Sequence, residues 1–218
     1  MLFQYFAFTA SLYFLDTILR IITKNPKSTW FFLHSYGNAI ITTYCIYHIF
    51  PIIKNPIQII ETNEEIYDTT LFILILHIYH LIFFNSNKED LFHHISFVFF
   101  GTFFKLLVNT GTIICFFHFF ICGLPGCIDY FILGLNKLNM ISREKRLTLA
   151  NEINIWVRAP GLIASNTLLV LYFFKNYHGS LPYILSLGSY FFTSFNGIYY
   201  MRQVFSANER KKMKASVP

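Results

Sequence analysis

The sequence has few charged residues. They make up 13% of its 218 residues, whereas 55% are hydrophobic and 20% are aromatic. A soluble domain usually carries about a quarter charged residues, so a water-facing globule is a poor match. Several apolar runs of about 20 residues are long enough to cross roughly 30 Å of hydrocarbon. The composition therefore predicts an integral membrane protein.

Two further signals are missing. No Lys or Arg precedes Asp16, so the first apolar segment lacks the basic region of a cleaved signal peptide, and we expect it to be retained as a span. The cysteines form no Cys-x-x-Cys pair, so the sequence indicates neither a disulfide framework nor a zinc knuckle. Buried free thiols are expected instead at Cys45, Cys115, Cys122 and Cys127.

We predict an all-α, polytopic membrane protein with about seven transmembrane helices. Breakers such as the Asn-Pro-Lys-Ser sequence at 25–28 separate the apolar segments. The predicted helices are residues 2–22, 29–53, 68–85, 90–109, 111–136, 146–175 and 181–205. They form a single transmembrane domain, residues 1–205, followed by a short basic tail at 206–218. Asp16 and Arg20, four residues apart on the first helix, are expected to pair.

The basic residues are distributed unevenly between these spans. With the N-terminus outside, in the lumen, most Lys and Arg fall in cytosolic segments; Lys54, Lys105 and Lys175 fall outside with the acidic loop 61–68. Cytosolic loops normally carry the excess of basic residues, so we expect a cytosolic C-terminus. The net charge of +6 is thereby explained without a nucleic-acid partner.

Histidines and a carboxylate gather at one place in the predicted spans. His77 and His80 share a face of one helix, and Asp90, His93 and His94 share a face at the start of the next. Ionisable groups within a span are costly and mark functional sites by default. Because a short loop joins the two helices, we expect both groups to meet near the cytosolic side. One alternative is that His77 and His80 only form hydrogen bonds to neighbouring helices. Another is that Asp90 only caps the N-terminus of the fourth helix.

Two later helices add polar groups to the same zone. His118 is followed by Cys-Gly-Leu-Pro-Gly-Cys at 122–127 and then by Asp129, and we expect the helix to kink or unwind at this sequence. The sixth helix carries Asn154 and Arg158, a polar stripe at about mid-depth. Breaks in spans are tolerated where protein or a watery cavity covers the backbone, so the sequence predicts a polar cavity.

The adjacent pair His93-His94 favours acid–base chemistry. Neighbouring helical residues point about 100° apart, so one imidazole can face a reacting group while the other holds a partner. Histidine changes charge near neutral pH, as general acid–base catalysis requires. A metal site is the alternative: two histidines with Asp129 or His118 would suit zinc. The full histidine boxes of membrane di-iron enzymes are missing, since no His-x-x-x-His occurs.

The chain resembles the TLC-domain membrane proteins, which include the ceramide synthases. The resemblance rests on DLFHH at 90–94, on His118 and then Asp129, on GLPGCIDYFILGLNKLN and EINIWVRAPG, and on FNGIYYMRQVF at 195–205. It covers roughly residues 30–205. It implies a protein of the endoplasmic reticulum or a related membrane that acts in lipid metabolism or lipid sensing, with His93 and His94 carrying acyl transfer. Phe119 replaces the acid that follows the synthases' histidine, so the wider family is implied rather than ceramide synthesis.

Together these patterns predict an acyltransferase that moves an acyl group from acyl-CoA to a membrane lipid acceptor. The expected catalytic residues are His93, His94, Asp129 and His118, and the expected substrate-binding residues are His77, His80, Asn154, Arg158 and Asp90. No metal and no tightly bound cofactor are expected in this reading; a homodimer is left open. The alternatives are a non-enzymatic lipid-binding, lipid-sensing or trafficking protein, and a metal-dependent lipid hydrolase or hydroxylase.

Overall fold

The computed structural model describes residues 2–59, 66–177 and 179–215, and every regular element in them is a helix. The all-α prediction is therefore confirmed for these residues. Residues 61–65 of the acidic loop and 216–218 of the tail, which entered the orientation prediction, lie outside the described residues.

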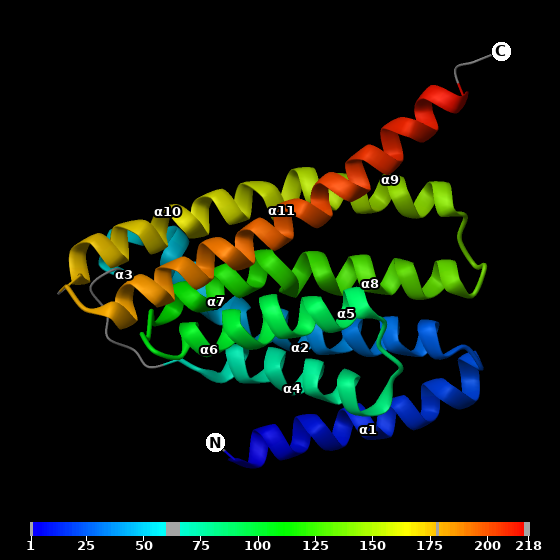
Figure 1. Cartoon of the computed structure of the whole chain (residues 1–218), viewed down its shortest axis with the longest axis horizontal. Helices are drawn as coiled ribbons and strands as arrows, with labels where there is room; N and C mark the ends of the chain where they lie inside the picture. The colour runs from blue at the N-terminus through cyan, green and yellow to red at the C-terminus, as the bar shows by residue number, and fades with distance from the viewer. Residues whose placement is uncertain (1, 60–65, 178, 216–218) are drawn as a thin grey trace.

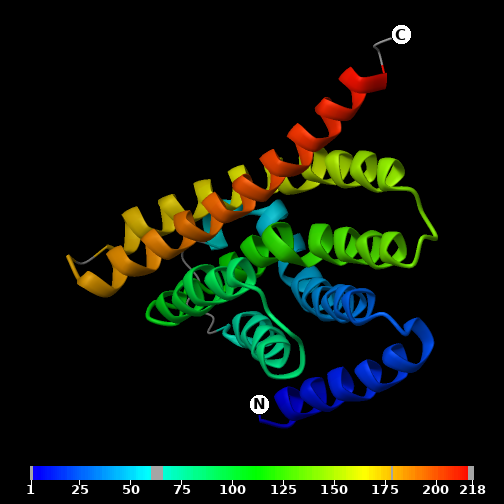
Figure 2. The same ribbon diagram turned by 45° about the vertical axis from the view of Figure 1, so that its right-hand side comes forward.

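Long helical segments form a bundle of roughly parallel rods (Figure 1). Four of them are single helices: α1 (Leu2–Thr23), α2 (Pro26–Lys54), α4 (Asp68–Phe83) and α11 (Leu181–Ala215). Three are continuous runs in which α-helical and π-helical (η) turns follow one another: α5 (Lys88–His93), η1 (His94–Phe100) and α6 (Gly101–Lys105); α7 (Thr112–His118), η2 (Phe119–Gly123) and α8 (Leu124–Lys137); and α9 (Arg143–Ile153), η3 (Asn154–Arg158) and α10 (Ala159–Asn176). The short helix α3 (Pro56–Ile59) lies between α2 and α4. Their bounds lie close to those of the predicted helices, except that α11 continues past 205 to Ala215. Figures 1 and 2 both show α11 projecting beyond its neighbours.

Three segments of the described chain are long and apolar enough to cross a membrane: Leu2–Thr23, Thr112–Lys137 and Arg143–Asn176. The helix Asp68–Phe83 is apolar but shorter. The other predicted spans carry more polar residues. In α2, for example, serine, threonine, histidine and asparagine side chains are buried. Membrane crossing by these other helices stays a prediction.

The surface supports a membrane protein. Large apolar side chains such as Phe3, Phe14, Ile163 and Phe174 are exposed along α1 and α10, with 82% of Phe174 accessible. Soluble monomers rarely expose extended apolar patches. Hydrocarbon is a suitable environment for these faces.

Local signals at the helix starts explain where the rods begin. Asn25 Oδ1 accepts hydrogen bonds from the backbone N–H of Lys27 and Ser28, and Pro26 follows it at the start of α2. Ser142 caps α9 by accepting from Lys145 N at 3.1 Å. The breaker at 25–28 therefore acts as a cap.

The sequence Gly-Leu-Pro-Gly at 123–126 does not unwind its helix, although the regular α-helical turns are interrupted just before Pro125. The chain stays helical through η2, a π-helical segment with wide turns, and Pro125 lies in the first turn of α8. Proline lacks an N–H and clashes with the carbonyl one turn back. The wider π-helical turns directly before Pro125 change which backbone carbonyl faces the proline ring, so the helix continues through this sequence.

α2 lies at the centre of the bundle and packs against α1, α4, α7 and α8. Small residues let α2 and α8 approach closely: a Cβ on Gly126 would lie 2.7 Å from Asn38 Nδ2. Hydroxyls join the same helices, because Ser28 Oγ donates to Gly134 O at 3.1 Å and Ser35 Oγ donates to Cys127 O at 2.7 Å. This contact fixes α8 beside the polar face of α2.

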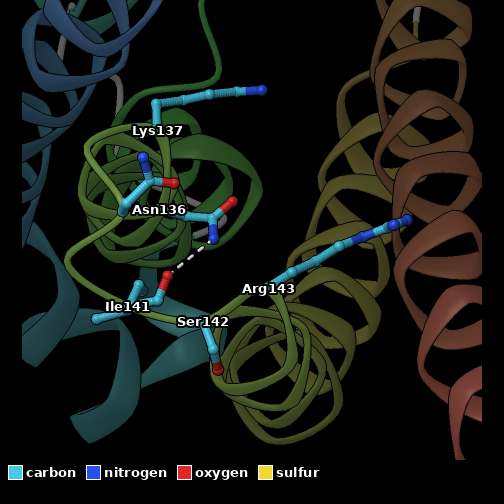
Figure 3. A pocket seen from close by; sticks show the side chains of 6 residues that line it. Asn136, Lys137, Ile141, Ser142 and Arg143 are labelled. Atoms are coloured by element: carbon cyan, nitrogen blue, oxygen red, sulfur yellow. Dashed lines mark hydrogen bonds between the residues drawn. The ribbon is translucent and has the colours of Figure 1, made fainter.

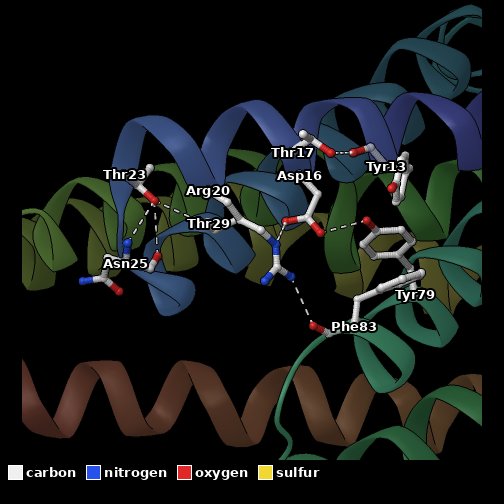
Figure 4. Close-up of polar contacts among 9 residues, drawn as sticks. All are labelled: Tyr13, Asp16, Thr17, Arg20, Thr23, Asn25, Thr29, Tyr79 and Phe83. Atoms are coloured by element: carbon white, nitrogen blue, oxygen red, sulfur yellow. Dashed lines mark hydrogen bonds and ion pairs between the residues drawn. The ribbon is translucent and has the colours of Figure 1, made fainter.

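The predicted Asp16–Arg20 pair is confirmed and also joins α1 to α4 (Figure 4). Arg20 Nε donates to Asp16 Oδ1 at 2.7 Å, and the Tyr79 hydroxyl donates to Asp16 Oδ2 at 2.9 Å. Arg20 also donates to the carbonyl oxygen of Phe83 at 3.1 Å. The first helix is therefore held against the helix that carries His77 and His80.

Candidate functional site

Five histidines come together between α2, α4 and the α5–η1 run. We call this group the histidine cluster: His34, His77, His80, His93 and His94. Ring centroids lie 4.7 Å apart for His80 and His94, 5.1 Å for His77 and His94, and 5.0 Å for His34 and His77. The prediction that the third and fourth helices bring their histidines together is confirmed.

His94 is fixed by two hydrogen bonds. Its Nδ1 lies 2.5 Å from the carbonyl oxygen of Asp90, and its Nε2 lies 3.0 Å from His80 Nδ1. A carbonyl can only accept, so His94 Nδ1 carries the proton. In the neutral ring Nε2 is then an acceptor, and His80 Nδ1–H must donate to it. The tautomers of both rings follow from this one backbone contact.

The two histidines of α4 are held in place by an aromatic ring and by a second hydrogen bond to the backbone. Trp30 of α2 stacks on His80 with centroids 3.8 Å apart and planes 23° apart. His77 Nδ1 donates to the carbonyl oxygen of Ile73 at 2.7 Å. His80 and His94 are each 5% exposed. The cluster is thus rigid and largely closed to solvent at these two rings.

His93 differs from its neighbour. Its ring is 5.5 Å from that of His94, and the planes are 89° apart, as adjacent helical positions require. Nδ1 of His93 is buried and has no hydrogen-bond partner among the described residues. On its other side, α11 brings the Asn196 side chain within hydrogen-bonding reach and Tyr200 to 5.8 Å between ring centroids. Of the adjacent pair, His93 is therefore the imidazole whose Nδ1 has no partner among the described residues.

Asp90 lies at the third position of α5, and the N-cap is Asn87 rather than Asp90. Its carboxylate accepts from Asn87 N at 3.2 Å, while Asn87 Oδ1 accepts from Asp90 N at 2.8 Å, a reciprocal capping box. Its backbone carbonyl, rather than its carboxylate, orients His94. Asp90 therefore contributes to the cluster by holding the helix start and one tautomer.

A second polar group lies beside the first, which we call the Asp–Arg cluster: Asp129, Arg146, Asn154 and Arg158. Arg158 is 8% exposed and donates to Asn154 Oδ1. Asp129 is within electrostatic range of both arginines. Within the described part of the chain, Asp129 Oδ1, Arg146 Nε and Arg158 Nε are buried without hydrogen-bond partners. Buried polar atoms normally find partners, so these mark a place that a polar ligand can fill.

Tyr130 connects the two clusters. Its ring lies 4.3 Å from that of His34, and it follows Asp129 directly in α8. It is also within electrostatic range of Arg158 and of Tyr200, which borders His93. The polar layer thus draws residues from α2, α4, the α5–η1 run, α8, the α9–η3 run and α11, more helices than the sequence predicts.

His118 lies elsewhere. Its Nδ1 is 2.8 Å from Thr69 Oγ1 at the start of α4. His80 is eleven residues further along the same helix, which corresponds to about 16 Å at 1.5 Å per residue. The predicted grouping of His118 with the His93–His94 pair is therefore not what the structure shows.

Three of the expected site residues lie where a helix changes to π-helical turns. His94 begins η1, His118 directly precedes η2, and Asn154 begins η3. π-Helical turns are rare in proteins overall, and those that occur are often found at functional sites. Each one rotates the following side chains relative to a regular helix, and no propensity pattern in the sequence indicates it.

No three histidine, cysteine, aspartate or glutamate side chains of the described residues converge closely enough to hold one metal ion. In the histidine cluster, the two nitrogens His80 Nδ1 and His94 Nε2 are already used in a hydrogen bond to one another.

An open pocket of about 550 Å³ lies where α8 turns into α9 (Figure 3). Lys137 and Arg143 line it together with Ser142, and Asn136 Nδ2 donates to Ile141 O at 3.0 Å across the turn. Arg146 of the Asp–Arg cluster follows Arg143 by one helical turn. The pocket thus has a basic rim at the α8–α9 turn, one helical turn from Arg146.

Several residues of the polar layer were not among the predicted site residues. His34 contacts His77 and Tyr130 and leaves its Nδ1 buried without a partner among the described residues. Its four-residue spacing from Trp30 on one helical face was the available signal. Asn196 lies in the FNGIYYMRQVF sequence that carries the family resemblance, which was the signal for α11.

No protein-family model, curated protein or solved structure matches the chain.

Proposed function

We propose that the chain is a TLC-like membrane acyltransferase that moves an acyl group from acyl-CoA to a lipid acceptor at the histidine cluster. The observation that carries this proposal is the contrast between two adjacent imidazoles. His94 is fixed by two hydrogen bonds, whereas Nδ1 of His93 is buried without a partner among the described residues. An open imidazole nitrogen beside a fixed one suits general acid–base catalysis.

The proposed reaction uses His93 twice. His93 removes the proton from the acceptor's O–H or N–H while the oxygen or nitrogen attacks the thioester carbonyl. The C–S bond then breaks, and the departing thiolate of CoA takes the proton from the imidazolium. His94 and His80, which are hydrogen-bonded to one another, form the fixed side of the cluster beside His93.

The Asp–Arg cluster, which Tyr130 connects to the histidine cluster, is proposed to stabilise charge in this step. Arg158 is a buried guanidinium with a free Nε among the described residues, and preorganised donors of this kind stabilise developing negative charge. Asp129 partly balances the two arginines, so the cluster has a net positive charge that suits a thioester oxyanion or a phosphate. Lys137 and Arg143, at the rim of the nearby pocket, suit the phosphates of a CoA donor.

We further propose seven membrane spans, with the N-terminus in the lumen of the endoplasmic reticulum or a related membrane and the C-terminus in the cytosol. The uneven distribution of Lys and Arg supports this direction. It places the basic pocket between α8 and α9 on the cytosolic side, where acyl-CoA is soluble.

Lipid binding without turnover is the second candidate. It is favoured by the unpartnered atoms of Asp129 and Arg158, which a lipid headgroup can satisfy without any reaction. This candidate shares the site and differs only in the chemistry at His93.

The test is purified protein in phosphatidylcholine vesicles that contain a total membrane-lipid extract, supplied with palmitoyl-CoA. We expect release of free CoA thiol and an equal amount of newly acylated lipid in the mass spectrum. Asp129→Asn should lower both rates together without reducing the folded fraction. Tight binding of palmitoyl-CoA with no thiol release would overturn the transferase and leave lipid binding.

A further inference from the structure

An apolar groove runs along the outside of the bundle between the η1–α6 run and α11. It has a volume of about 520 Å³. Its walls are aromatic and aliphatic and its floor is built from small residues; among the lining residues are Ser96, Phe100, Phe104, Ile184, Gly188 and Phe192. No charged residue lines it. About half of the surface of Phe100 and of Ile184 is accessible, at 53% and 55%, so the groove opens sideways from the bundle.

The groove leads toward His93. The two helices run antiparallel, because Phe97 stacks on Phe192 with centroids 4.4 Å apart, whereas His93, earlier in the chain, meets Tyr200, later in the chain. Ser96, at the end of the groove, is three residues from His93, and Phe192 is four residues from Asn196. The groove therefore ends about one helical turn from the open imidazole.

Its length matches one lipid chain. Ile184 and Phe192 are eight residues apart, or about 12 Å, and Asn196 lies about 18 Å from Ile184 along the helix at 1.5 Å per residue. A hydrocarbon chain of about this length, extended along the groove, thus brings its polar end to the level of His93 and Asn196.

We infer that this groove holds one hydrocarbon chain of a membrane lipid whose polar end is presented to His93. The occupant follows from complementarity along the groove: an uncharged apolar tract that faces the bilayer ends at an imidazole, an amide and a phenol, which matches an amphiphile. As the route of the acyl acceptor, the inference rests on the transferase proposed above; as a chain-binding groove, it is tested without turnover.

Gly188 offers a clean perturbation. A Cβ built on Gly188 meets no atom within 4 Å, so a larger side chain projects into open space rather than into the core. Gly188→Leu should fill the groove and leave the fold intact. Ala7→Leu adds similar bulk on an exposed face of α1 and serves as the matched control.

The experiment is photolabelling in phosphatidylcholine vesicles with a lysophosphatidylcholine that carries a diazirine in its single chain. We expect peptides with Phe100, Ile184 and Phe192 to be labelled in the wild type and in Ala7→Leu, and labelled at least fivefold less in Gly188→Leu. Equal labelling of these peptides in Gly188→Leu, or equal labelling of α1 and α10 peptides in the wild type, would overturn the inference.

Failure of the transferase gives a different result. Groove labelling that depends on Gly188 in a protein that releases no CoA from palmitoyl-CoA would support the groove and remove the transferase. Turnover in a protein whose groove peptides are never preferentially labelled would support the transferase and overturn the groove.

Discussion

The hydrogen bond between His80 and His94 makes a quantitative prediction for His94→Ala. The substitution removes an interhelical bond of 3.0 Å between two side chains that are each 5% exposed. Such bonds contribute about 0.6–2 kcal/mol in membrane proteins. The change also leaves His80 Nδ1–H buried without a partner, which costs about 1–3 kcal/mol. Because the two figures describe largely the same lost contact, we expect a total loss of about 2 kcal/mol in the free energy of unfolding.

Tryptophan fluorescence can follow this unfolding. The chain has two tryptophans; Trp30 stacks on His80, and Trp156 is 73% exposed. In a Trp156→Phe background, the fluorescence of Trp30 during unfolding by sodium dodecyl sulfate reports directly on the cluster. The control is His93→Ala, which removes a ring whose Nδ1 has no described partner and breaks no bond to His80, so it should cost less than His94→Ala. Equal losses in both variants, or no loss in His94→Ala, would refute the division of roles between the two rings.

Two further predictions concern the packing of the bundle. Gly161→Ala should destabilise the protein by about 1–3 kcal/mol through overpacking, because its Cβ would lie 2.0 Å from Cδ1 of Phe120; Gly188→Ala, with open space at its Cβ, should be neutral or stabilising, and unfolding midpoints in detergent compare the two. Tyr79→Phe removes the bond to Asp16 and should increase proteolytic release of α1 from detergent-solubilised protein, whereas unchanged protection would show that this bond does not hold the helix.

The sequence predicts the parts of this structure that depend on local pattern. Apolar runs and breakers place the helices, because both act within a few residues. The spacing of His77 with His80, and of Asp90 with His93 and His94, predicts that each group shares one helix face. The short loop between the two helices predicts that these two groups lie close together.

Other parts depend on how the helices rotate against one another, which one sequence does not encode locally. His34 joins the cluster because α2 packs closely on α4, where a Cβ on Gly37 would lie 2.7 Å from Leu76 Cδ2. His118 faces the start of α4 instead of the cluster, a difference of three helical turns that composition does not show. The wide turns of η2 likewise continue a helix that Pro125 was expected to break.

The central claim is that His93 is the acid–base group of an acyl transfer, and the rate of CoA release from palmitoyl-CoA by His93→Ala tests it most directly. His48→Ala, a histidine of α2 that stacks on Tyr44 outside the cluster, is the matched control. General acid–base groups contribute about 10²–10⁴-fold, so we predict a loss of that size for His93→Ala in protein that unfolds at the wild-type midpoint, and an unchanged rate for His48→Ala. A His93→Ala protein that transfers acyl groups at the wild-type rate would contradict the account.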